Sequence, residues 1–205
     1  MQKVDRFSML ELRNLAQFLL KDFFQGPVPT HRGIDILDFA LTYCHLKVRF
    51  SSLSFPNSHP WGALTLDPVS LRHSGNPPVQ IPGRTILLDS RLKHRSELRN
   101  FTIAHECAHY ALFHQGLTSL EHQISENYAD LLALELLIPP QILKTFFSRE
   151  HLTLSLFPSQ KDPLPSSLFA LQKLLGVSSS VLMAALKREQ FLQNQSNQKE
   201  FYYVN

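Results

Sequence analysis

The stretch 101-FTIAHECAHYALF-113 decides both the fold and the chemistry that this sequence predicts. It is apolar on nearly every side, as expected of a helix buried in a protein core. His105 and His109 are four residues apart, so on a helix both imidazoles lie on one face and can reach a single metal ion. Glu106 lies on the adjoining flank, where its carboxylate can exchange a proton with water at that metal. The His-Glu-x-x-His spacing therefore predicts a zinc site that hydrolyses peptide bonds.

A catalytic zinc ion needs a third protein ligand and one open position. His114 follows His109 by five residues, about 140° round the helix, so it points away from the metal and is predicted to be a packed histidine. Glu126 and Asp130, in the next predicted helix, are four residues apart and share one face. We predict that Glu126 is the third ligand and that Asp130 accepts the N–H of His105 or His109. The competing interpretation is two solvated carboxylates near a helix N-terminus.

The residues alone leave other assignments open at this site. Glu121 and His122 are alternative ligands, and Asp130 becomes the ligand if Glu126 is not one. Amide hydrolysis also needs a donor that stabilises the negative charge on the tetrahedral oxygen. The candidates near the motif, each with a core or surface role as the competing interpretation, are Tyr110, Tyr128, Arg95 and Arg99.

Hydropathy patterns around the motif predict an α+β fold. Apolar residues recur at helical spacing over residues 8–24, 33–45, 97–114 and 119–138. They alternate with polar residues, as in half-buried strands, over residues 46–50, 61–66 and 85–90. The segment 67–84 is rich in proline and glycine and is typical of a loop. Ser96 is predicted to cap the motif helix and Gly116 to end it, and Pro139-Pro140 is predicted to end the helix that follows. The predicted sheet has about three strands, antiparallel or mixed, and packs on the motif helix.

A smaller helical part is predicted near the C-terminal end. Ser178 is expected to cap the second of two short helices, at 167–177 and 178–192. The predicted units are a catalytic domain, a helical extension packed on it and a flexible tail, at residues 1–150, 151–192 and 193–205. The helix pair has the shape of a helix-turn-helix. Its second helix begins Ser-Ser-Ser-Val-Leu-Met-Ala-Ala and lacks the side chains that read bases, so packing is predicted and direct DNA binding is not.

Composition excludes several classes of protein. The 205 residues carry a formal charge of +3, too mild to indicate a nucleic-acid binder. The two cysteines form no disulfide framework, which is typical of a reducing compartment. The first residues hold no apolar signal region, and no run reaches the length of a membrane span. We therefore expect a cytoplasmic protein that does not bind membranes.

Two stretches, 86-ILLDSRLKHRSELRNFTIAHECAHYALFH-114 and 126-ENYADLLALELLIP-139, resemble the ImmA/IrrE metallopeptidases. The resemblance is looser at 27–50 and at 174–189. It implies a zincin-like fold, zinc as the cofactor, the ligands His105, His109 and Glu126, and Glu106 as the catalytic glutamate.

The resemblance also implies the kind of substrate. Family members typically cleave helix-turn-helix repressors of the Cro/cI type, often encoded nearby, and so derepress stress, phage or mobile-element genes. The alternative from another class is a regulator that binds DNA or a partner through the C-terminal helix pair, as a toxin–antitoxin or phage component does. In that case the zinc site is structural or non-proteolytic.

Overall fold

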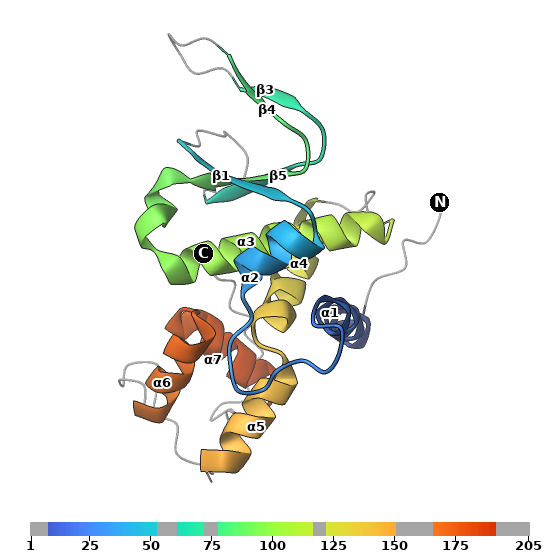
Figure 1. Ribbon diagram of the computed structural model, residues 1–205. Coiled ribbons are helices and arrows are strands. Elements are labelled where there is room, and N and C mark those ends of the chain that lie inside the picture. The colour runs from blue at the N-terminus through green and yellow to red at the C-terminus, as the bar shows by residue number, and fades with distance from the viewer. Residues whose placement is uncertain (1–7, 53–60, 72–77, 117–121, 151–165, 192–205) are drawn as a thin grey trace.

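The computed structural model describes residues 8–52, 61–71, 78–116, 122–150 and 166–191 of the chain. Within these ranges a small sheet packs on the long motif helix α3 (Ser96–His114), and most of the other helices gather on the side of α3 away from the sheet (Figure 1). The α+β class predicted from the sequence is confirmed.

The sheet has three strands in the order β1-β5-β2 and is mixed. The strands are β1 (Lys47–Ser51), β2 (Gly62–Thr65) and β5 (Thr85–Asp89), close to the predicted positions. The central strand β5 is buried along its whole length, and it pairs parallel with β1 and antiparallel with β2. Among the described residues no strand pairs with the second edge of β2. Strand β2 also packs against the motif helix α3.

The prediction of a plain loop at 67–84 was wrong. This segment holds an antiparallel hairpin of β3 (Val69–Leu71) and β4 (Val79–Ile81), which extends away from the three-stranded sheet (Figure 1). Each strand has only three residues, and the prolines and glycines that flank them hide so short an alternation.

The helices agree with the predictions except in three places. Ser96 is the first residue of α3 rather than its cap, and Arg95 takes the cap position without a side-chain hydrogen bond. The segment 33–45 forms only a short helix followed by a π-helical turn, and a helix not predicted at all begins at Pro140. Proline is favoured at the first helical position because its missing N–H is not needed there. The helices besides α3 are α1 (Met9–Phe23), α2 (Ile36–Asp38), η1 (Phe39–Tyr43), η2 (Ser90–His94), α4 (His122–Leu137), α5 (Pro140–Glu150), α6 (Ser166–Leu175) and α7 (Ser179–Arg188).

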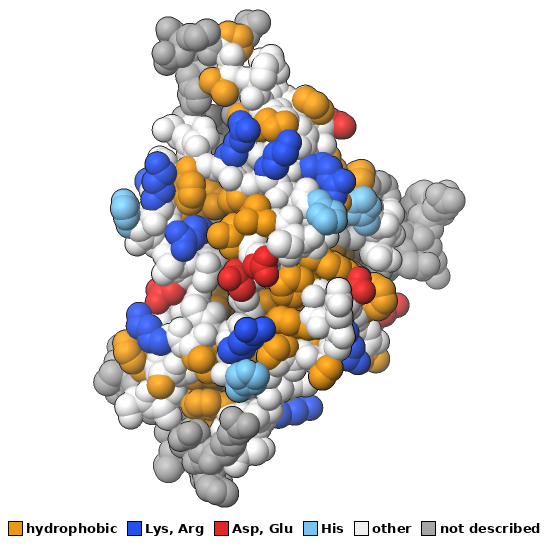
Figure 2. Space-filling model, in the orientation of Figure 1, with side chains coloured by type: hydrophobic (Ala, Val, Ile, Leu, Met, Phe, Trp, Pro, Cys, Tyr) orange, Lys and Arg blue, Asp and Glu red, His pale blue; other side chains and the backbone are white. Residues whose placement is uncertain are grey.

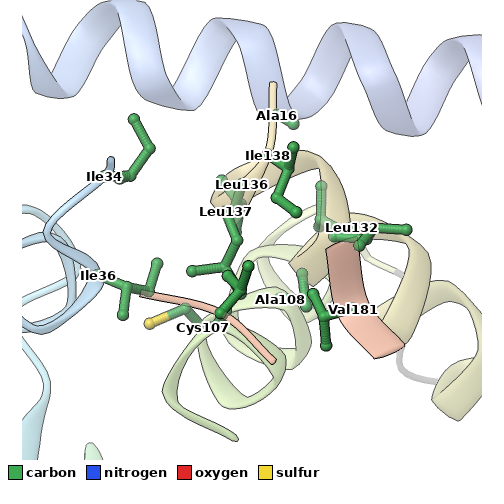
Figure 3. Packing of buried hydrophobic residues seen from close by; sticks show 14 of the residues in the cluster. Ala16, Ile34, Ile36, Cys107, Ala108, Leu132, Leu136, Leu137, Ile138 and Val181 are labelled. Atoms are coloured by element: carbon green, nitrogen blue, oxygen red, sulfur yellow. The ribbon is translucent and has the colours of Figure 1, made fainter. Parts of the chain in front are cut away.

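The hydrophobic core joins α3 and α4 to the helices around them. Figure 3 shows Ala16 of α1, Ala108 of α3, Leu132 of α4 and Val181 of α7 pointing into one cluster of buried side chains. No single described helix has the length and hydropathy of a membrane span. Two bent pairs of helices, α4 with α5 and α6 with α7, reach that length and hydropathy only when each pair is taken together.

The C-terminal helix pair packs into this same core. Ser178 caps α7 by accepting the N–H of Val181, as predicted, and Gly176 turns the chain with a φ of +63°. Buried side chains of α7, Val181, Leu182, Ala185 and Leu186, belong to the cluster, while Ser179 and Ser180 stay exposed. The predicted linker before the pair and the predicted tail at 193–205 lie outside the described residues.

Candidate metal centre

Three side chains from two helices converge on one point. His105 and His109 leave the same face of α3, and their Nε2 atoms lie 3.0 Å apart. Glu126, near the start of α4, places one carboxylate oxygen 3.2 Å from the Nε2 of His105 and the other 3.2 Å from the Nε2 of His109. Ala129 and Ala133 of α4 are fully buried, so small side chains allow α4 to approach α3 closely enough for this contact.

Asp130 lies behind His105, on the side away from Glu126. Its Oδ1 atom is 2.8 Å from the Nδ1 atom of His105, which leaves the Nε2 atom to face the centre. Burial opposes a charge on His105, but the hydrogen bonds to Asp130 and Glu126 outweigh it and raise the pKa of His105 to about 10. Hydrogen bonds from the two histidines lower the pKa of Glu126 below its usual range. The centre therefore keeps the Glu126 carboxylate ionised beside a proton on His105 that a metal ion can displace.

Glu106 is buried between the motif helix and strand β2. Burial raises the pKa of its carboxyl group, although the two neighbouring histidines and a hydrogen bond from the backbone N–H of Leu64 act in the opposite direction. A Cβ atom at Gly62 would lie 3.0 Å from a Glu106 oxygen and 2.4 Å from the side chain of Thr102. Only glycine therefore lets the edge strand come this close to the glutamate.

The donor atoms of the centre suit a small divalent cation. One ligand atom from each of His105, His109 and Glu126 lies within 4.8 Å of the other two. Two imidazole nitrogens and a carboxylate all offer lone pairs, so they converge stably only around a proton or a cation. Ligands of a tetrahedral zinc ion lie about 3.3 Å from one another, which is close to the separations seen here.

The sequence of the chain matches a known protein family. The family described as the IrrE N-terminal-like domain, Peptidase_M78, matches residues 62–187, from β2 through nearly all of α7. The chain is a metallopeptidase of the ImmA/IrrE family. No curated protein matches the sequence.

Some predicted residues of this metallopeptidase lie away from the three converging ligands. His114 is exposed and contacts the ring of Tyr110, with 4.4 Å between the ring centroids. The hydroxyl of Tyr110 accepts a hydrogen bond of 2.6 Å from Arg84. Tyr128 is buried in the hydrophobic core. The alternative ligand Glu121 and the side chain of His122 lie outside the described residues.

The sequence did not indicate the strand residues that contact the site. Gly62 and Leu64 lie beside the buried carboxyl group of Glu106, one through its lack of a side chain and the other through its backbone N–H. A glycine inside a predicted strand is a signal of close backbone approach, and it was available at position 62. Which side chains lie against this glycine depends on how distant strands pair, and no local sequence pattern predicts that pairing.

Proposed function

We propose that this metallopeptidase is a cytoplasmic, zinc-dependent endopeptidase that cuts a helix-turn-helix repressor at one or a few sites. The observation that carries the proposal is the convergence of His105, His109 and Glu126 beside a buried Glu106, under the free edge of a strand. This arrangement offers three ligands, a proton acceptor and a place for an extended peptide. The ImmA/IrrE resemblance supports the repressor as the substrate class.

Zinc would be held by His105, His109 and Glu126. When bound, it supplies a Lewis acid that polarises the scissile carbonyl group and acidifies water. Glu106 then takes one proton from the attacking water at its carboxylate and delivers it to the leaving nitrogen, so the glutamate ends as it began. Burial suits Glu106 to this role, because a raised pKa makes its carboxylate a stronger base.

Strand β2 supplies the binding edge for the peptide. The N–H of Asp89 donates to the carbonyl oxygen of Trp61 over 2.9 Å, and the register pairs Ala63 with Leu87. In an antiparallel pair, bonded residues alternate with residues whose polar groups point outward. Gly62 and Leu64 therefore direct their backbone groups away from β5. The N–H of Leu64 donates to Glu106, and the carbonyl groups of both residues can accept hydrogen bonds from a substrate strand that adds at this edge.

This edge also restrains the enzyme, because it accepts an extended segment and a folded protein exposes few of them. We expect the purified, zinc-loaded protein to cut one regulator encoded beside its gene at one or a few sites. Casein is expected to be degraded only slowly. Mass spectrometry of the products, after incubation with casein and with each neighbouring regulator, measures the number of cleavage sites and the rate of degradation. Broad degradation of casein with every regulator left intact would replace the proposal with a general peptidase.

Asp130 is proposed to hold His105 in the orientation that presents Nε2 to zinc. Asp130→Ala is therefore expected to lower the affinity for zinc about 10- to 100-fold, the usual effect of removing an acceptor behind a histidine ligand. Competition with a chelator of known affinity measures the change. Asp67→Ala, which removes an exposed aspartate, is the control and should leave the affinity unchanged. Equal affinities of the Asp130→Ala variant and the unmodified protein would remove Asp130 from the site.

A further inference from the structure

A cationic aromatic cluster lies at the start of the edge strand. Trp61 directly precedes β2, and two guanidinium groups lie over its ring. The guanidinium carbon of Arg91 is 4.5 Å from the ring centroid and that of Arg95 is 5.6 Å from it. Both arginines are exposed, and they come from the turn that joins the sheet to α3. The cluster is therefore a surface feature between the start of β2 and the turn that leads into α3.

The two arginines are held in place in different ways. Asp89 binds Arg91 through its backbone N–H and its guanidinium group, with the shortest contacts at 2.8 Å, so that this side chain is fixed over the indole. Arg95 has no acidic partner among the described residues, and its cation–π contact orients it. A guanidinium group stacked on an aromatic ring keeps its N–H donors at the rim, where they match both oxygens of a carboxylate. Asp89 already occupies the Nε and Nη2 donors of Arg91. The cluster thus has an ordered anion-binding face on which Arg95 supplies the main pair of donors.

The position of the cluster ties it to the substrate. Gly62, the next residue after Trp61, lies against Thr102 and Glu106, and Leu64 donates to Glu106. A peptide that pairs antiparallel with β2, the more stable arrangement, passes Leu64 first, then Gly62, and then reaches Trp61. Each residue advances the peptide by about 3.4 Å. The residues that follow the scissile bond therefore run towards the cluster.

We propose that Trp61, Arg91 and Arg95 form a subsite that binds an acidic side chain of the substrate, at the second or third residue after the scissile bond. This inference rests on the proposed endopeptidase function and adds a preference that the zinc centre itself does not supply. A carboxylate there meets one guanidinium group fixed by Asp89 and one held only by the indole.

A general attraction for polyanions is the competing explanation. In the view of Figure 2 most of the charged side chains over the sheet are lysine or arginine. Lys47 and Arg49 of β1 are also exposed. A nucleic acid binds such a surface through many phosphates and not through one pair of arginines. The subsite is favoured because its cations are ordered on an aromatic ring at the end of the substrate edge. Lys93 provides a control, since it lies in the same turn but stacks on Phe50 at 5.7 Å.

Trp61 is the single tryptophan of the chain, so its fluorescence reports on the subsite directly. We would titrate zinc-loaded Glu106→Gln protein with blocked nonapeptides of alanine and valine that carry two adjacent aspartates after their centre. The matched peptides carry asparagines at those positions, lysines at those positions, or the aspartates before the centre. The same titration is made with a ten-nucleotide oligothymidylate. Arg95→Glu, Arg95→Met and Lys93→Glu are tested after circular dichroism has shown that each variant is folded.

The aspartate peptide is expected to change the Trp61 emission saturably and to bind roughly three- to tenfold more tightly than the asparagine peptide. Arg95→Met should lose this preference, Arg95→Glu should transfer it to the lysine peptide, and Lys93→Glu should keep it. The proposal is overturned if aspartate and asparagine peptides bind alike, if no peptide changes the emission, or if Lys93→Glu and Arg95→Glu act equally. Tighter binding of the oligonucleotide, dependent on Arg95, would also overturn it in favour of a nucleic-acid surface.

Two further results separate this inference from the proposed function. If the wild-type protein cuts its regulator and the aspartate preference is absent, the endopeptidase stands and the subsite fails. If zinc-loaded protein cuts nothing and the aspartate peptide still binds through Arg95, the cluster is an acidic-peptide site and the endopeptidase proposal fails. A preference for aspartates before the centre would overturn the assigned position.

Discussion

Replacing Glu106 by glutamine is expected to lower peptide cleavage by roughly two to four orders of magnitude while zinc stays bound. Glutamine has nearly the shape of glutamate, so it fits the narrow space against Gly62, and its amide oxygen can still accept the Leu64 N–H. None of the three proposed ligands changes. The amide cannot take a proton from water, so the variant loses proton transfer and keeps the site.

The decisive comparison measures cleavage rate and zinc content on the same preparation. Glu97→Gln is the control, because it makes the same chemical change on the same helix at a partly exposed position, where the carboxylate pairs with Lys173 at 3.4 Å. It should cut at the wild-type rate. His105→Ala, in contrast, should lose both zinc and activity. If Glu106→Gln cuts at a rate near that of the wild type, proton transfer by this residue is not part of the mechanism.

The histidine pair of the candidate metal site could be predicted because the information that positions it is local. A spacing of four residues on a helix places His105 and His109 side by side in any fold that keeps the helix. Glu126 needed one further assumption, that the next helix packs against the first, and its two buried alanines favoured close packing. The observed cluster contains the three predicted residues. The roles of Asp130, Tyr110 and Tyr128 remain predictions.

The strand at 61–66 and its place at the sheet edge could be predicted, but its contacts with the site could not, because they depend on pairing between distant segments. Gly62 meets Glu106 across more than forty positions of the chain, and Trp61 meets Arg95 across more than thirty. The hairpin at 69–81 was missed for another reason, since strands of three residues carry too little alternation to distinguish them from loops. Local periodicity thus gave the ligands, and long-range pairing supplied the surface that would bind a substrate.

A second feature that no local pattern predicts is a buried ionic network between α1, α4 and α7. Glu135 of α4 is 1% exposed and receives Arg13 at 3.1 Å and Arg188 at 3.4 Å. Glu189 completes the network through ion pairs with both arginines. The side chain of Arg188 also donates to the backbone carbonyl of Ile138 at 3.3 Å, which ties the end of α7 to the end of α4. The network therefore fixes the C-terminal helix pair on the helix that carries Glu126.

Arg188→Ala is expected to lower the free energy of unfolding by about 3–5 kcal/mol at neutral pH, because the buried carboxylate of Glu135 then loses one of its two arginine partners. Burial already raises the pKa of Glu135 against the opposing effect of the two arginines, and removing Arg188 raises it further. A carboxyl group whose pKa is raised in the folded state binds its proton more tightly there than in the unfolded chain. The loss should therefore be full above the folded-state pKa and should shrink as the pH falls towards 4.5, the ordinary value.

Urea unfolding of both proteins at several pH values measures this loss. Lys144→Ala removes a positive charge from an exposed position of α5 and is the control, with a change expected within about 0.5 kcal/mol. Adding Glu135→Leu to Arg188→Ala should restore part of the stability, because the carboxylate left behind by the first change is then gone. A loss that is independent of pH and is not relieved by Glu135→Leu would show that Arg188 acts through its packing and its bond to Ile138, and that the charge of Glu135 is not the cause.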